Sequence, residues 1–143
     1  FLAAPKPERE ACMNRIPVNP WPWSLPLGYN QAELLTGTSR QLICAGQTAV
    51  DATGAPQHPG DMRGQLALTL DNLEAVLKAA GMGLADVVRL EVYATDVDAA
   101  MRNFDLLGQR FGPLGIAPPM TLLGVTRLAL PPLMIEIAAT AAD

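Results

Sequence analysis

Cysteine and histidine are scarce in this chain of 143 residues, and the shortage argues against several kinds of site. The two cysteines, Cys12 and Cys44, are too few and too far apart for a disulfide framework or a CxxC motif. The single histidine, His58, has no second histidine or cysteine at a metal-ligand spacing. We therefore expect no metal site, and we interpret His58, which lies in a turn between Gln57 and Pro59, as a solvated loop residue.

Basic residues are also few, and none of them cluster. Ten lysines and arginines stand against 14 acidic residues, which gives a net charge of −4. Proteins that bind nucleic acid neutralise its phosphates with a basic stripe or patch, and no such pattern is present. A nucleic-acid partner is therefore not expected.

Long hydrophobic runs are missing as well. No apolar segment reaches the ~18–20 residues of a membrane span, and no secretory signal pattern precedes the body of the chain. We expect a cytoplasmic protein. Half of the residues are hydrophobic and only 17% are charged, which suits one domain with a compact core. This apolar surplus fits extra burial between subunits, and it fits equally well a composition that is simply rich in alanine and leucine.

The first residues show no periodic pattern. Met13 is a candidate start of the natural chain, so we predict that residues 1–15 form a leader or disordered segment and residues 16–143 a single domain. Prolines in residues 19–23 argue against a helix there. We expect this segment to be an extended arm that covers an apolar surface with Trp21 and Trp23.

The remaining pattern predicts an α+β fold. Four leucines (Leu66, Leu70, Leu73 and Leu77) recur on one helical face, and a second helix is predicted from Asp96 to Phe111. The predicted strands are residues 31–35 and 40–47, joined as a hairpin, then 86–95, 120–128 and 133–140. The order β-β-α-β-α-β-β predicts one sheet with both helices on one face and the other face free for a partner subunit.

Glu136 is the most interesting polar residue of the last predicted strand. Ile135 and Ile137 alternate with Glu136 and Ala138, so Glu136 lies on the less apolar face. A carboxylate in this place belongs either to a pocket, where it suits general acid–base work, or to a solvated face. On this pattern alone the solvated face is the stronger interpretation.

Five segments, in order, resemble the Rid family, which is also called YjgF and whose members were once labelled L-PSP endoribonucleases. They are residues 28–32, 44–47, 70–81, 86–96 and 135–141. The resemblance implies a chorismate-mutase-like subunit that forms a homotrimer with a barrel-like core and three ligand clefts at the subunit interfaces. It also implies hydrolysis of imines and enamines, such as 2-aminoacrylate, to a keto acid and ammonia without a metal or organic cofactor.

The resemblance places Met120 where these deaminases carry an arginine that binds the substrate carboxylate. The matching block here is Pro118-Pro-Met-Thr, and a thioether offers no hydrogen-bond donor. Leu122 stands where several members have cysteine, and Thr121 lies between the two. Arg127 cannot replace the arginine, because seven residues along one strand place it roughly 23 Å away on the opposite face.

The other site residues that the resemblance implies are Tyr29 and Glu136 as catalytic candidates and Ala45, Gly46 and Asn103 as substrate-binding candidates. Glu136 would position the attacking water. Two functions remain open: a diverged hydrolase or deaminase of imines, enamines or amides, and a trimer that binds a metabolite without turnover. An endoribonuclease is a weaker third, because the acidic chain offers no basic track.

Overall fold

The computed structural model describes residues 13–143. The predicted leader therefore lies almost wholly outside the described residues, but Asn14 and Arg15 already belong to the first strand. In chain order the elements are β1 (Asn14–Val18), the 3-10 helix η1 (Pro22–Leu27), β2 (Ala32–Thr36), β3 (Gln41–Ile43), β4 (Gln47–Thr48), α1 (Met62–Ala79), η2 (Leu84–Asp86), β5 (Val87–Ala94), α2 (Val97–Arg102), α3 (Asp105–Phe111), η3 (Gly112–Leu114), β6 (Met120–Gly124) and β7 (Ile135–Ala142).

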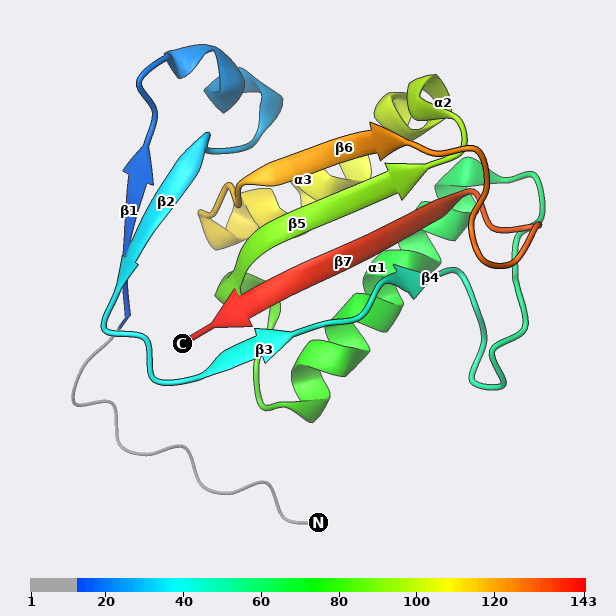
Figure 1. Cartoon of the computed structure of the whole chain (residues 1–143), viewed down its shortest axis with the longest axis horizontal. Coiled ribbons are helices and arrows are strands. Elements are labelled where there is room, and N and C mark those ends of the chain that lie inside the picture. Colours follow the sequence, from blue (N-terminus) through cyan, green and yellow to red (C-terminus); the bar gives the residue numbers. More distant parts are fainter. Residues whose placement is uncertain (1–12) are drawn as a thin grey trace.

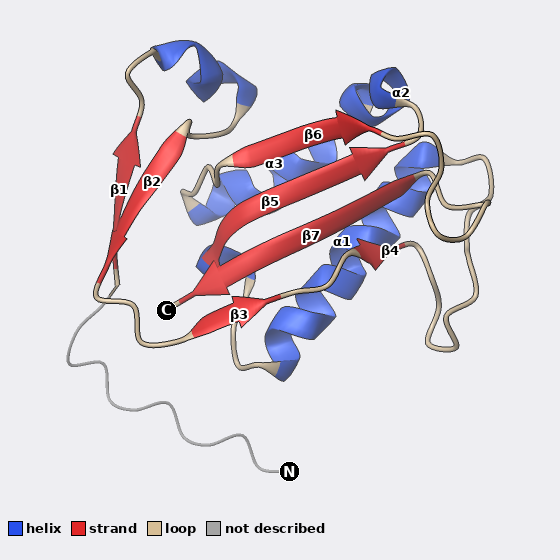
Figure 2. Cartoon of the chain, viewed as in Figure 1, coloured by secondary structure: helices blue, strands red, loops and turns tan. Residues whose placement is uncertain are grey.

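The main sheet has the strand order β3-β7-β5-β6, and the short β4 also pairs with β7. Strands β5 and β6 are parallel, and every pairing with β7 is antiparallel. Helices α1 and α3 lie behind this sheet, and the described chain places no helix on its front face (Figure 2). The predicted α+β architecture with helices on one face is confirmed, and we call the front the helix-free face.

Helix α1 forms as its leucine pattern predicts. Its N-cap is Asp61, whose carboxylate accepts a hydrogen bond from the Gly64 N–H, a contact worth about 1 kcal/mol. The four leucines of the predicted face are fully buried against the sheet. After the last turn, Gly81 takes a positive φ of 72°, which glycine adopts without strain.

The second predicted helix is broken into α2 and α3. Asp96 caps α2 as expected, with its carboxylate accepting from the Ala99 N–H. Asn103 then ends α2, because its side-chain amide donates to the Ala99 carbonyl and competes with the next helical turn. Helix α3 starts two residues later, at Asp105.

The predicted hairpin between residues 31–35 and 40–47 is wrong. Strand β2 pairs with β1 in a separate ribbon of two strands, whereas β3 pairs with β7 (Figure 1). Arg15 fastens this ribbon to the body: its guanidinium donates to both oxygens of Glu33 and to the carbonyls of Ala85 and Val87. The turn at residues 37–40 therefore carries the chain from the ribbon to the sheet rather than folding it back.

The predicted extended arm is also wrong beyond Trp21. Pro22 occupies the first position of η1, where its fixed φ suits a helical turn and its missing N–H costs nothing. Trp21 and Trp23 are 62% and 59% exposed, so neither covers an apolar surface of its own chain.

Of the last two predicted strands, the first is shorter than predicted and the second has the predicted length but begins two residues later, and the two do not pair with each other. Strand β6 ends at Gly124, and β5 lies between β6 and β7. Gln65, fully buried on α1, holds the loop before β7: its amide donates to the carbonyls of His58 and Pro132, and its oxygen accepts from the Met134 N–H.

Candidate functional site

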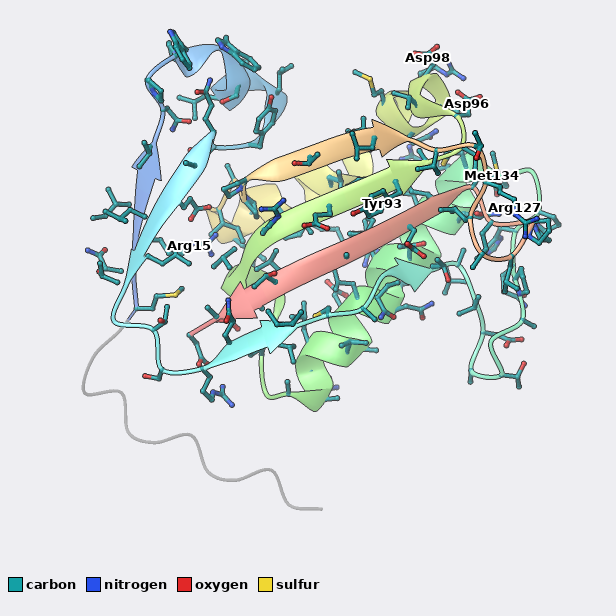
Figure 3. The ribbon with its side chains drawn as sticks, viewed as in Figure 1. Arg15, Tyr93, Asp96, Asp98, Arg127 and Met134 are labelled. Carbon is teal, nitrogen blue, oxygen red and sulfur yellow. The ribbon has the colours of Figure 1, made fainter. Side chains whose placement is uncertain are left out.

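The sheet register separates the predicted site residues into two groups. Leu90 pairs with Met120 and faces the helices, whereas Tyr93, which is labelled in Figure 3, pairs with Glu136. Because side chains alternate along a strand, Leu90 and Tyr93 point to opposite faces of β5. Met120 and Glu136 of one chain therefore lie on opposite faces of the sheet and cannot share a cleft within that chain.

The helix-side group surrounds a pocket of about 380 Å³. Its walls come from η1, β5, α3, the segment before β6 and the first residue of β6, Met120. Every lining residue is a glycine, proline, alanine, leucine, isoleucine, phenylalanine or methionine. No lining side chain carries nitrogen or oxygen, so the side chains suit a hydrocarbon group and offer no partner to a charge.

The second group lies on the helix-free face around Glu136. A Cβ added to Gly46 would lie 2.6 Å from the Glu136 Cδ and 2.8 Å from its Oε2, so the carboxylate occupies the space that any side chain at Gly46 would need. Strand β4 places this segment by pairing Thr48 with Glu136. The structure therefore brings Gly46 and Glu136 into contact, with the exposed Ala45 beside them.

Two residues of β5, Glu91 and Tyr93, also belong to this second group, although their residue types alone did not mark them as site residues. The Tyr93 hydroxyl donates to Glu91 Oε2 at 2.9 Å, and Arg89 forms an ion pair with the same Glu91 carboxylate. Mainly through the Glu91 hydrogen bond, with a smaller contribution from the nearby Glu136 charge, the pKa of Tyr93 is raised. Glu91 and Tyr93 are two residues apart on the predicted strand 86–95, and this spacing, which puts both on one face, was the signal in the sequence that could have identified them.

The remaining predicted residues divide between the two faces. Leu122 packs with Met120 against the helix-side core, whereas Thr121 is exposed and pairs in register with Glu91. Tyr29 is half-buried and follows Gly28 of the pocket wall, with its ring at an edge-to-face distance of 6.3 Å from Trp23. Asn103 does not line the pocket. Its side-chain amide donates to the Ala99 carbonyl, and its side-chain oxygen accepts from Arg63.

Arg127 lies in the loop after β6, because the strand ends three residues before it. Its guanidinium donates to the carbonyls of Leu128 and Ala129, near the end of the sheet where Met134 lies (Figure 3). It is thus directed at its own loop rather than at either group of site residues.

Two further kinds of feature are absent from residues 13–143. In this part of the chain no three His, Cys, Asp or Glu side chains are grouped so that they could hold a metal ion. None of its helices is long and apolar enough to cross a membrane.

The fold and the two groups of residues describe an α+β subunit with an apolar pocket on one sheet face and a carboxylate on the other. Residues 26–143 match the family model described as Endoribonuclease L-PSP. The chain belongs to this family, the Rid or YjgF family.

Three relatives illustrate the similarity. The mitochondrial protein mmf2 of Schizosaccharomyces pombe is 36% identical over 93 residues, which cover 64% of this chain and 70% of mmf2. The Rid family protein YyfB of Yersinia pestis has a TM-score of 0.80 at 34% identity, covering 92% of this chain and 98% of YyfB. TdcF of Escherichia coli, solved with bound serine, has a TM-score of 0.65 at 26% identity, covering 90% of this chain and 94% of TdcF.

Proposed function

We propose that the protein is a diverged Rid hydrolase that converts an imine, an enamine or a related amide with water, using Glu136 and no carboxylate-binding arginine. The observation that carries this proposal is the Glu136 carboxylate, which is held over the bare backbone of Gly46. Because Gly46 has no side chain, the carboxylate can lie against the backbone there, and a carboxylate held in place is the base that water activation needs.

Glu136 would act as the base. Its carboxylate accepts a proton from water while the water oxygen bonds to the imine carbon and the C=N π electrons move to nitrogen. A proton then returns from Glu136 to the nitrogen of the tetrahedral intermediate. Glu136 then moves the hydroxyl proton of this intermediate to the nitrogen, and the C–N bond breaks as the C=O bond forms, so one imine and one water give one carbonyl compound and one ammonia.

The complete site would form between two copies of the chain. Within one chain the pocket at Met120 and the carboxylate of Glu136 lie on opposite faces of the sheet, so each face supplies half of a cleft. A closed ring joins unlike faces of neighbouring subunits, and a trimer gives three equivalent clefts. We propose the homotrimer with a barrel-like core on this ground, with light scattering as its test; a stable monomer that retains turnover would contradict it.

A direct assay tests the reaction. Imines are released in situ by an amine oxidase or an amino-acid oxidase, and ammonia formation is compared with and without the protein. We expect acceleration that falls by roughly 10²–10⁴-fold in Glu136→Gln, since that is the usual contribution of a general base. Equal rates for Glu136→Gln and the parent protein would rule Glu136 out.

Complementation between two inactive variants tests whether the site is shared between chains. Glu136→Gln removes the base, and Gly108→Leu fills the pocket wall that Gly108 lines. In randomly mixed trimers about a quarter of the interfaces combine an intact pocket from one variant with an intact carboxylate from the other. Recovery of about a quarter of the activity supports a shared site, whereas no recovery from mixed trimers would contradict it.

A metabolite-binding trimer without turnover is the second candidate. The lack of any nitrogen or oxygen in the side chains of the pocket favours it, because such a wall retains a ligand but performs no chemistry itself. A shift of the melting temperature with apolar ligands, without ammonia release from any imine of the panel, would establish it.

Partners and location follow the same reasoning. The net charge of −4 weighs against RNA as a substrate despite the family's description as an endoribonuclease. We expect a small molecule as the ligand, no nucleic-acid or membrane partner, no metal or organic cofactor, and a cytoplasmic location. The mitochondrial relative mmf2 makes fractionation the appropriate check of location.

A further inference from the structure

Helix α3 faces the pocket with a glycine at its centre. Phe104, Leu107 and Phe111 line the pocket at helical spacing, and Gly108 and Gly112 lie on the same face. At these two positions of the pocket wall no side chain extends into the pocket. The pocket therefore owes part of its volume to these two positions.

The fold of the described chain gives no other reason for glycine at position 108. Its φ is not positive, and a Cβ added there would meet no atom within 4 Å. Glycine in a helix interior is less stable than alanine, because it loses more backbone freedom on folding. A destabilising residue is thus kept where its effect is to leave open space in the pocket wall.

The pocket also excludes charge. A carboxylate that entered it would lose its water and meet no donor from any lining side chain, including Met120 at the start of β6. The space itself is generous, since a cavity of about 150 Å³ already holds benzene, and this one has about 380 Å³. The shape and chemistry suit an aromatic or branched hydrocarbon group larger than benzene.

We propose that this pocket binds the uncharged hydrocarbon part of the substrate, so that the reacting compound is a neutral imine or enamine derived from an aryl-alkyl or branched ketone rather than an imino acid. The inference rests on the proposed function in taking the pocket and Glu136 of a neighbouring copy as one site. Gly108 and Met120 are then specificity-determining residues: Gly108 sets the size of the hydrocarbon group, and Met120 keeps the wall free of charge.

A pair of ketones that differ at one group tests the proposal by calorimetry. In 4-phenylbutan-2-one a methyl group stands where 2-oxo-4-phenylbutanoate has a carboxylate. We expect the neutral ketone to bind at least about tenfold more tightly to the full chain, because the carboxylate would be desolvated without a partner. Equal or tighter binding of the keto acid, or no binding of the neutral ketone, would overturn the proposal.

Three variants locate the binding. Gly108→Leu should weaken the binding of 4-phenylbutan-2-one by at least about tenfold. Gln109→Leu changes an exposed residue at the next position of α3 and should leave this affinity unchanged. Met120→Arg should reverse the preference between the two ketones, since a guanidinium pairs with a carboxylate. Unchanged affinity in Gly108→Leu would place the ligand elsewhere.

Alanine at position 108 separates a ligand role from a structural one. Gly108→Ala should raise the melting temperature by about 2 °C, because helix propensity improves and the added methyl group meets open space. It should also weaken the binding of the neutral ketone. A lower melting temperature or a dissociated oligomer would show instead that the glycine serves packing between copies, and would overturn the proposal.

Binding is measured in Glu136→Gln as well as in the parent protein. If both bind the neutral ketone equally but no imine is turned over, the proposed reaction fails and the pocket assignment stands. If imines are turned over with loss in Glu136→Gln but the neutral ketone does not bind, the pocket assignment fails and the reaction stands.

Discussion

The two faces of the main sheet carry opposite kinds of chemistry on the same strands. On the helix side, Leu90, Ile137 and Met120 belong to a packed core and an apolar pocket. On the helix-free face, the neighbouring positions carry Glu91, Tyr93 and Glu136, which are joined by a hydrogen bond and by electrostatic coupling. One face therefore presents apolar side chains, and the other presents carboxylates and a phenol.

Neither face alone carries both the apolar pocket and the Glu136 carboxylate. A strand presents successive residues to opposite sides, so no movement of side chains within one chain brings Met120 to Glu136. Under the proposed function, a second copy completes the site by placing its helix-free face against the pocket of the first. Four changes test how far the difference between the faces holds.

The largest effect is expected from shortening a core residue of β7. Ile137→Ala removes a fully buried side chain on the helix side and should lower the free energy of unfolding by about 3 kcal/mol. Thr140→Ala on the other face should change it by less than about 0.5 kcal/mol. Denaturant titration measures both values; equal losses would mean that the helix-free face is packed as tightly as the core.

Gly46→Ala should disturb the carboxylate with little effect on the fold. The added methyl group would lie within 3 Å of Glu136, whose flexible side chain must move away. Under the proposed function we expect turnover to fall about a hundredfold while the melting temperature changes little. Gly83→Ala is the matched control, because its Cβ would meet nothing within 4 Å. Similar losses of turnover in both variants would show that the contact between position 46 and Glu136 is not the cause.

Gln65→Leu tests whether a residue on the helix side helps to position Glu136 on the helix-free face. The change leaves the Met134 N–H and two carbonyls without their buried partner, so the free energy of unfolding should fall by about 2 kcal/mol. Met134 precedes Glu136 by two residues, and we therefore expect a loss of turnover under conditions where the variant is still fully folded. Full activity at that point would show that the loop before β7 does not position the carboxylate.

The smallest effect concerns the ionisation of Tyr93. Because Glu91 raises its pKa, the phenol of Tyr93 stays neutral above the ordinary tyrosine range near 10. The stabilising hydrogen bond is present below that range and is lost as the pH rises through the raised pKa.

Ultraviolet titration at 295 nm can follow this ionisation, since the whole chain has only two tyrosines. Glu91→Gln should move the Tyr93 step to lower pH, and Tyr93→Phe should remove it. If Glu91→Gln leaves the titration unchanged, the hydrogen bond between the two side chains does not control Tyr93.

Local patterns predicted the elements that depend on nearby residues. The leucine spacing of α1, the Asp96 cap of α2 and the alternation that exposes Glu136 opposite Ile135 and Ile137 all follow from one stretch of chain each. The wrong predictions concerned the pairing of strands and a side chain that competes with the backbone hydrogen bonds of a helix. A Gly-containing turn does not reveal that β2 pairs with β1, and the Asn103 side chain that breaks the second helix looks like any helix residue in the sequence.

The candidate site shows the same limit. The residue types at Gly46, Met120 and Glu136 were recognised from the sequence, because each lies in a segment that resembles the family. Their division between two faces was not, since it depends on which strand lies beside which. Glu91 and Tyr93 were missed for that reason: they gain meaning only when β5 is placed between β6 and β7.

The sequence by itself determined the family, the α+β class and the absence of a charged group at Met120, because these depend on residue identity and local period. Only the tertiary structure decided that Met120 faces an apolar pocket while Glu136 lies over Gly46 on the other side. The physical reason is that strand register is a contact between segments far apart in the chain, and a shift of one residue exchanges the two faces.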